Sequence, residues 1–122
     1  MGNILLQEKI ETLRHLADNL LHIGDRDESI YADDLTLLNR NIHDQINELY
    51  PQRGNNLEQE AALCLSLLMG YSVSMYANPE DEFKKRSVLD RSRKLLPILS
   101  PSSLKEQLLT LCDNLEHSFE IN

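Results

Sequence analysis

The sequence predicts an all-α protein: a compact orthogonal or antiparallel bundle of about five helices around one central, apolar helix. Leucine supplies 24 of the 122 residues, whereas glycine and proline together supply eight, and this composition favours helix over strand. Apolar residues recur at spacings of three and four, and Gly, Pro and Asn divide the periodic stretches into five. A chain of this length is enough for one core, so we expect a single helical domain over residues 1–122.

The first two helices are expected over about residues 3–23 and 34–49. Asn3 is a suitable cap for the first helix and Gly24 ends it, while Pro51 ends the second. The first apolar stripe consists of Leu6, Ile10, Leu13, Ala17 and Leu20. The second stripe consists of Leu35, Leu38, Ile42, Ile46 and Leu49.

The third helix, over about residues 57–76, is expected to occupy the centre of the domain. Asn56 is the expected cap, and Glu58 and Glu60 lie in the first turn, where a helix favours negative charge. The stripe of this helix consists of Leu57, Ala61, Cys64, Leu68, Tyr71 and Met75. Its other faces carry Leu63, Leu65, Leu67 and Met69. A helix that is apolar nearly all round is surrounded by neighbours, which places it at the centre.

The last two helices are expected over about residues 79–96 and 102–118. Pro79 suits the first helical position of the fourth helix, because its missing N–H is not needed there. The inner face of the fourth helix consists of Val88, Leu89, Leu95 and Leu96. The stripe of the fifth helix consists of Leu104, Leu108, Leu111 and Leu115. In the fifth helix, Ser103 and Glu106 have the spacing of a capping box.

Composition excludes several classes of protein. With 12 basic and 20 acidic residues the net charge is −8, which disfavours nucleic-acid binding in general and predicts no sequence-specific DNA recognition. No basic leader is visible, and Ser, Gly and Asn interrupt the longest uncharged stretch, residues 61–79. Cys64 and Cys112 have no CxxC partner, which predicts buried free thiols, with a disulfide as the minor alternative. We therefore expect a cytoplasmic protein that does not contact a membrane.

No group of residues predicts catalysis, a cofactor or a metal. His15 and His22 are seven residues apart, whereas metal ligands on one helix are usually three or four apart. The acidic turn at residues 25–28 lacks the Gly and Glu positions of a calcium loop. Neither a GxSxG elbow nor a Ser-x-x-Lys motif is present. We expect a protein that is not an enzyme.

The fourth helix carries a cluster of basic residues. Six of the twelve basic residues fall within residues 84–94, so this segment carries a charge of +5 and the rest of the chain −13. Five of the six are expected on the face opposite the apolar one: Lys84, Arg86, Arg91, Arg93 and Lys94. One interpretation is an ordinary solvated face, paired with the acidic first turn of the same helix. The other is a docking surface for an acidic partner or for RNA.

Tyrosines near the expected helix ends are further candidates for an interface. Tyr31, Tyr50 and Tyr76 occupy such positions, where an aromatic side chain can anchor a partner or simply mark a domain boundary. Tyr31 ends the polar connector at residues 24–31, which we expect to be exposed. Tyr31 and the five basic residues are therefore the candidate partner-binding residues.

Four segments resemble a known family. EAALCLSLLMGYSVSMY at residues 60–76 is similar to the mid-chain helix of the UpxZ proteins, the transcription antitermination antagonists of capsular polysaccharide loci in Bacteroides-type bacteria. SVLDRS at residues 87–92 and SLKEQLLTLC at residues 103–112 resemble the two helices that follow in that family. HIGDRDESIYADDLTLLN at residues 22–39 resembles the loop upstream. The resemblance covers about residues 16–112.

The resemblance implies a regulatory protein without catalysis. It would bind and inhibit NusG-like antiterminators (UpxY type) of other capsular loci by occupying a surface that the antiterminator, alone or in complex with RNA polymerase, needs. An acidic protein suits this role, because charge complementarity to a basic face speeds association. The alternative is a helical adaptor or self-associating module without a transcriptional role, and a homodimer stays open. Family members are expected to continue with a further acidic helix beyond the last residues of this sequence.

Overall fold

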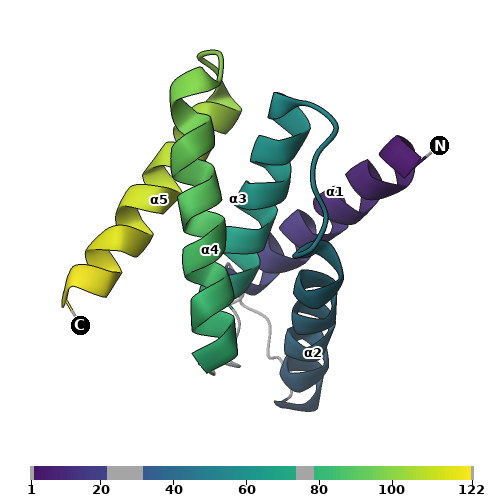
Figure 1. Cartoon of the computed structure of the whole chain (residues 1–122). Helices are drawn as coiled ribbons and strands as arrows, with labels where there is room; N and C mark the ends of the chain where they lie inside the picture. Colours follow the sequence, from purple (N-terminus) through teal and green to yellow (C-terminus); the bar gives the residue numbers. More distant parts are fainter. Residues whose placement is uncertain (1, 22–31, 74–78, 122) are drawn as a thin grey trace.

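The structure, a computed structural model, describes residues 2–21, 32–73 and 79–121 (Figure 1). Its elements are α1 (Gly2–Leu21), α2 (Ala32–Leu49), α3 (Leu57–Val73), α4 (Pro79–Leu95), the short 3₁₀ helix η2 (Leu96–Ile98) and α5 (Ser103–Ile121). These described residues form no strand, so the all-α prediction is confirmed. The connector that contains Tyr31, and residues 74–76 of the third predicted helix, lie outside the described ranges.

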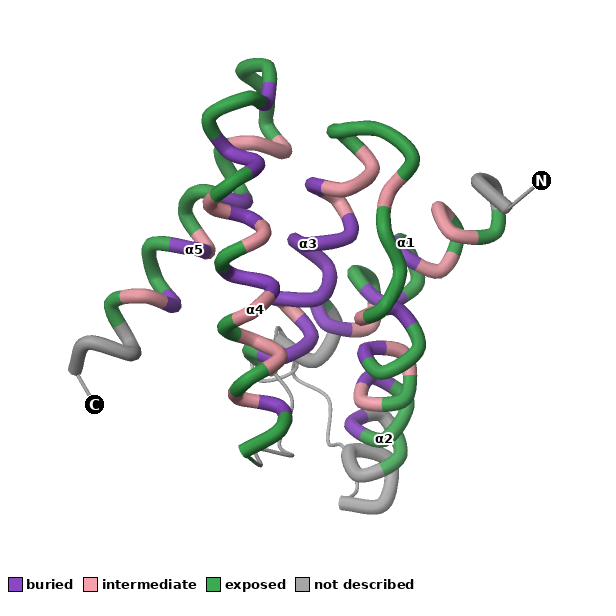
Figure 2. Tube along the Cα trace, in the orientation of Figure 1, coloured by how far each residue is buried: buried purple, intermediate pink, exposed green. Residues whose placement is uncertain are grey.

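α3 lies at the centre of the bundle. It contacts α1 and α2, which also contact each other, and it contacts α4 and α5, which form a second pair. Figure 2 shows buried residues along almost the whole length of α3. The predicted central position is confirmed, because α3 contacts all four other α-helices and is buried on several sides. The fully buried members of this helix are Ala61, Leu63, Cys64, Ser66, Leu67 and Leu68.

Two small residues allow α3 to approach its neighbours closely. Ser66 is fully buried, and its hydroxyl donates a hydrogen bond of 3.1 Å to the Ile10 carbonyl of α1. This bond satisfies a polar group that would otherwise be costly to bury. Gly70 faces α2, and a Cβ added to it would lie 2.8 Å from two side-chain carbons of Ile46. A larger residue at position 70 would therefore displace Ile46 from the core.

The helix caps were only partly predictable. At α3 the expected cap is confirmed, because the Asn56 side-chain oxygen accepts a hydrogen bond of 2.8 Å from the Gln59 N–H. At α5 the predicted capping box of Ser103 and Glu106 is wrong. Ser102 is the cap instead, and its hydroxyl accepts a bond of 3.2 Å from the Lys105 N–H. Consecutive serines at positions 102 and 103 made the two registers hard to distinguish from sequence.

A side-chain contact also joins the two helix pairs directly. His43 of α2 lies with its Nε2 3.2 Å from Oδ2 of Asp81 on α4. Asp81 is buried and His43 is half-buried. This contact therefore orients the beginning of α4 against α2.

Candidate partner-binding surface

α4 is a highly charged helix whose charges follow its dipole. Three acidic residues, Glu80, Asp81 and Glu82, lie in its first turn, and Arg93 and Lys94 lie in its last. Both placements are favourable, because the beginning of a helix is electropositive and its end is electronegative. The buried apolar residues of α4 and η2 are Val88, Leu89, Leu95 and Leu96, as predicted for the inner face.

Arg91 is directed toward α3 rather than toward solvent. Its Nη2 and Nε donate to Oε2 of Glu60 at 2.8 and 3.2 Å, and only 15% of its side chain is exposed. The guanidinium also donates to the carbonyls of Tyr50 and Gln52, each at 3.4 Å. Glu60 in turn accepts a hydrogen bond of 2.9 Å from the Gly54 N–H. Arg91 therefore ties α4 to α3 and to the α2–α3 connection.

Arg93 is directed toward the other neighbour, α5. Its Nη2 donates to Asp113 at 2.7 Å, its Nε donates to Oε1 of Glu116 at 2.8 Å, and its Nη2 also bonds Glu116. These bonds stabilise the charged forms of both partners. They raise the pKa of Arg93 further above its ordinary value and lower the pKa of the Glu116 carboxyl. Arg93 therefore fixes the α4–α5 pair.

Lys84 is half-buried at the side of α4 that faces the end of α2. Its Nζ lies 3.1 Å from Oε1 of Glu80 and 5.3 Å from the centre of the Tyr50 ring. This places a cation over an aromatic face while the ammonium also pairs with a carboxylate one turn away. The predicted pairing with the acidic first turn is confirmed for Lys84, and Tyr50 contacts α4 from the end of α2.

Arg86 and Lys94 are the candidate residues that point outward. Both are exposed, and they lie on the side of α4 away from buried Val88 and Ser92. The expected single basic face is therefore divided among four directions: toward α3 through Arg91, toward α5 through Arg93, toward the end of α2 through Lys84, and outward through the remaining two. The side chains of Arg91 and Arg93 are long enough to reach neighbouring helices, so their positions around α4 did not reveal their partners.

The sequence analysis missed two large apolar residues: Phe83, one turn before Arg86, and Ile98, which lies beyond the end of α4 and lines a hollow with Lys94. Phe83 is 70% exposed and Ile98, at the end of η2, is 62% exposed. Phe83 precedes Arg86 by three residues and Lys94 by eleven, so the three share one side of the helix. The three-residue spacing from Arg86 is the sequence signal that could have placed Phe83 on this side of α4. We refer to Phe83, Arg86, Lys94 and Ile98 together as the outward face of α4.

The two cysteines belong to the core. Cys64 and Cys112 are free and buried, as predicted, and burial raises the pKa of both thiols, that of Cys64 to about 11. Within the described ranges no three His, Cys, Asp or Glu side chains are grouped as metal ligands. In the same part of the chain, no helix combines the length and apolar character that crossing a membrane requires.

Comparison with known proteins identifies the family. The model of the UpxZ family of transcription anti-terminator antagonists matches residues 10–114. The chain belongs to the UpxZ family. The fold agrees: the crystal structure of a transcription anti-terminator antagonist UpxZ from Bacteroides uniformis matches with a TM-score of 0.78 and 31% sequence identity. That match covers 93% of this chain and 73% of the Bacteroides uniformis protein. No curated protein matches the chain significantly.

Membership of the UpxZ family decides between the two functions that the sequence left open. The protein is a transcription anti-terminator antagonist, and its role is regulatory rather than catalytic. The family match covers α4 and α5 up to residue 114, so it includes the outward face of α4. This UpxZ protein therefore acts through its surfaces, and the chemistry of those surfaces determines what it can bind.

Proposed function

We propose that this UpxZ protein binds NusG-like antiterminators of the UpxY type in the cytoplasm. By occupying a surface that the antiterminator needs for RNA polymerase or leader RNA, it prevents antitermination at other capsular loci. The outward face of α4 makes the contact. The candidate residues Lys84, Arg91 and Arg93 contribute less directly, by holding α4 in place, and Tyr31, outside the described residues, stays a candidate contact.

The exposed apolar residues on a basic helix face support this proposal most strongly. Phe83 and Ile98 are 70% and 62% exposed, although burying such side chains is favourable. Aromatic side chains and arginines are the residues on which protein interfaces most often depend. Phe83 and Ile98 fit apolar sites on a partner, and Arg86 and Lys94 fit carboxylates beside those sites. The face is therefore suited to an acidic, partly apolar patch of the antiterminator, which fits a surface for RNA polymerase better than a basic surface for leader RNA.

A binding experiment with purified components tests this contact. Several NusG-like antiterminators from the same genome are immobilised, and capture of the UpxZ protein is measured at two salt concentrations, with and without RNA polymerase. We expect Phe83→Ser to weaken capture at least about tenfold. We expect the double variant Arg86→Glu/Lys94→Glu to weaken it most at low salt, where surface charges are least screened. Capture that depends on added leader RNA would instead favour an RNA-bridged complex.

Matched variants on the other side of the molecule serve as controls. Leu37→Ser removes an apolar side chain that is 56% exposed on α2. Arg14→Glu/Arg40→Glu changes the net charge by the same amount as the α4 double variant, at exposed positions of α1 and α2. Arg91 and Arg93 are unsuitable, because reversing them sets like charges against Glu60 or Glu116. Equal losses in the test and control variants would contradict the outward face of α4 as the contact.

A further inference from the structure

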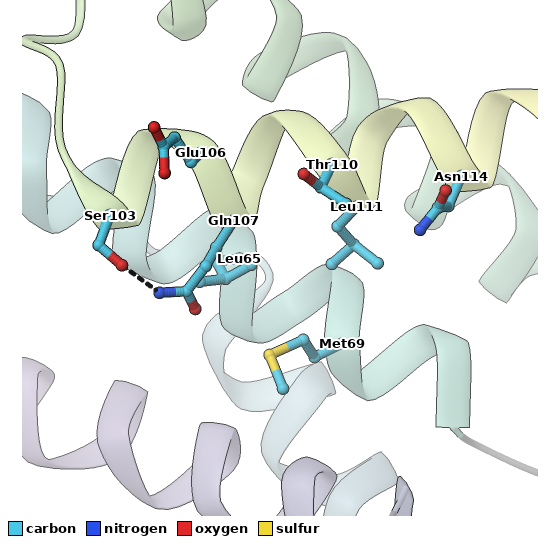
Figure 3. A pocket seen from close by; sticks show the side chains of 8 residues that line it. All are labelled: Leu65, Met69, Ser103, Glu106, Gln107, Thr110, Leu111 and Asn114. Carbon is cyan, nitrogen blue, oxygen red and sulfur yellow. Dashed lines mark hydrogen bonds between the residues drawn. The ribbon is translucent and has the colours of Figure 1, made fainter.

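An apolar groove runs between α3 and α5. Leu65 and Met69 of α3 form its floor, and Leu111 projects toward them from α5 (Figure 3). Gln107, Thr110 and Asn114 of α5 form one wall, and the open hollow has a volume of about 380 Å³. Gln107 and Glu116 are nine residues apart, which places them on opposite sides of α5. Because Glu116 bonds Arg93, the groove lies on the side of α5 away from Arg93. It is therefore separate from the outward face of α4.

A second, more polar hollow lies further along the same side of α3. Glu58, Ala62, Leu65 and Met69 follow each other at spacings of four, three and four, which places them in one row. Ala62 and Glu58 line this second hollow of about 220 Å³, which reaches Gln7 of α1. This row is partly covered: Glu58 is exposed, Ala62 and Met69 are half-buried and Leu65 is buried. α1 and α5 both contact α3 but, in the described ranges, do not contact each other. The row spans roughly 16 Å, about three helical turns.

The charges along the groove have one sign. Glu106 is the charged residue that lines the first hollow, and Glu58 is the charged residue that lines the second. Both are exposed, and neither has an ion-pair partner within the part of the chain that the structure describes. The basic residues that could neutralise this side are concentrated on α4 instead. The groove therefore combines an apolar floor with carboxylates beside it.

We propose that the α3–α5 groove binds a basic amphipathic helix of a protein partner. The length of the row suits about three turns of helix, whose apolar side chains pack on the half-buried Met69 and Leu111. Lysine or arginine side chains of that helix lie beside Glu58 and Glu106. An elongated groove with few convergent polar groups is less suited to a small molecule, whose orientation needs precisely placed polar partners. This inference does not depend on the antiterminator contact proposed above.

Two synthetic peptides test the chemistry of this occupant. Both have about 18 residues and the same row of leucines, and one carries lysines and the other glutamates on its remaining faces. Each is titrated into the ¹⁵N-labelled protein, and amide chemical shifts are followed by NMR. We expect the lysine peptide to shift the amides of Leu65, Met69 and Thr110, with the glutamate peptide causing no such change. Equal binding of both peptides, or shifts confined to other surfaces, would overturn the proposal.

Variants of exposed residues separate groove binding from general attraction to an acidic protein. Thr110→Trp fills the groove without a change of charge, and we expect it to raise the Kd of the lysine peptide about tenfold. Glu106→Lys is expected to raise that Kd about fivefold, whereas Asp44→Lys, an equal charge change on α2, leaves it nearly unchanged. Thermal unfolding of each variant verifies its fold. Equal effects of the two lysine variants on the Kd would rule out the basic helix. So would a dimer in sedimentation experiments that Thr110→Trp converts to a monomer, because a second copy of this chain would then occupy the groove.

Discussion

α3 and α4 are neighbouring helices of 17 residues each, yet they stabilise the protein in opposite ways. α3 is apolar on nearly every side and contacts all four other helices. α4 carries most of its residues as charges, and two of its arginines bond carboxylates on neighbouring helices. α3 thus depends mainly on packing, whereas α4 adds polar bonds at its flanks to an apolar inner face, and its outward face stays exposed.

The largest effect is expected from loss of packing at α3. Leu68 is fully buried, so Leu68→Ala should lower the free energy of unfolding by about 2–5 kcal/mol through lost burial and the cavity left behind. On α4, Phe83→Ala removes a larger side chain that is mostly exposed, and it should change stability by no more than about 0.5 kcal/mol. Urea denaturation followed by circular dichroism measures both. Similar losses for the two variants would break the contrast between the helices.

An intermediate effect is expected from the ion pair that joins the two helices. Glu60→Gln leaves the Arg91 guanidinium half-buried without its carboxylate, and we expect a loss of about 1–2 kcal/mol. Asp90→Asn, at an exposed position of α4, should cost less than about 0.5 kcal/mol. The double variant Glu60→Gln/Arg91→Met should recover part of the loss, because no charge is then left unpaired. An additive double variant would show that the pair contributes no coupling.

The smallest effect concerns the acid side of the pH profile. The pKa of Glu116 is lowered in the folded protein by Arg93, so the pair contributes stability above the ordinary pKa of 4.5 and loses it as the pH falls through the lowered value. Wild type should therefore exceed Arg93→Gln in stability at pH 7, and this difference should shrink below about pH 4. Urea denaturation at both pH values provides the comparison. A constant difference would indicate that Arg93 acts through packing of its stem.

The sequence was sufficient for the helices and the core, but only partly for the surface. Periodic leucines located α3 and its central position, because burial on every side follows from the residue types alone. The partners of Arg91 and Arg93 were not predictable, since Glu60 and Glu116 lie 31 and 23 residues away and tertiary packing brings them close. Phe83 was not predicted, because the binding face of α4 was identified by its charged residues alone. The α3–α5 groove depends on the separation of α1 and α5, which periodicity does not encode.

The middle position of α3 in the chain also bears on how the protein folds during synthesis. α1 and α2 leave the ribosome first, but α1 packs mainly against α3, a helix that begins only at Leu57, and α2 contacts both of them. The N-terminal pair therefore waits, with apolar surface exposed, until about Val73 has been made. From that point α4 and α5 add to a helix that is already present, through contacts closer in sequence. The core is therefore expected to be completed only when the middle of the chain is present.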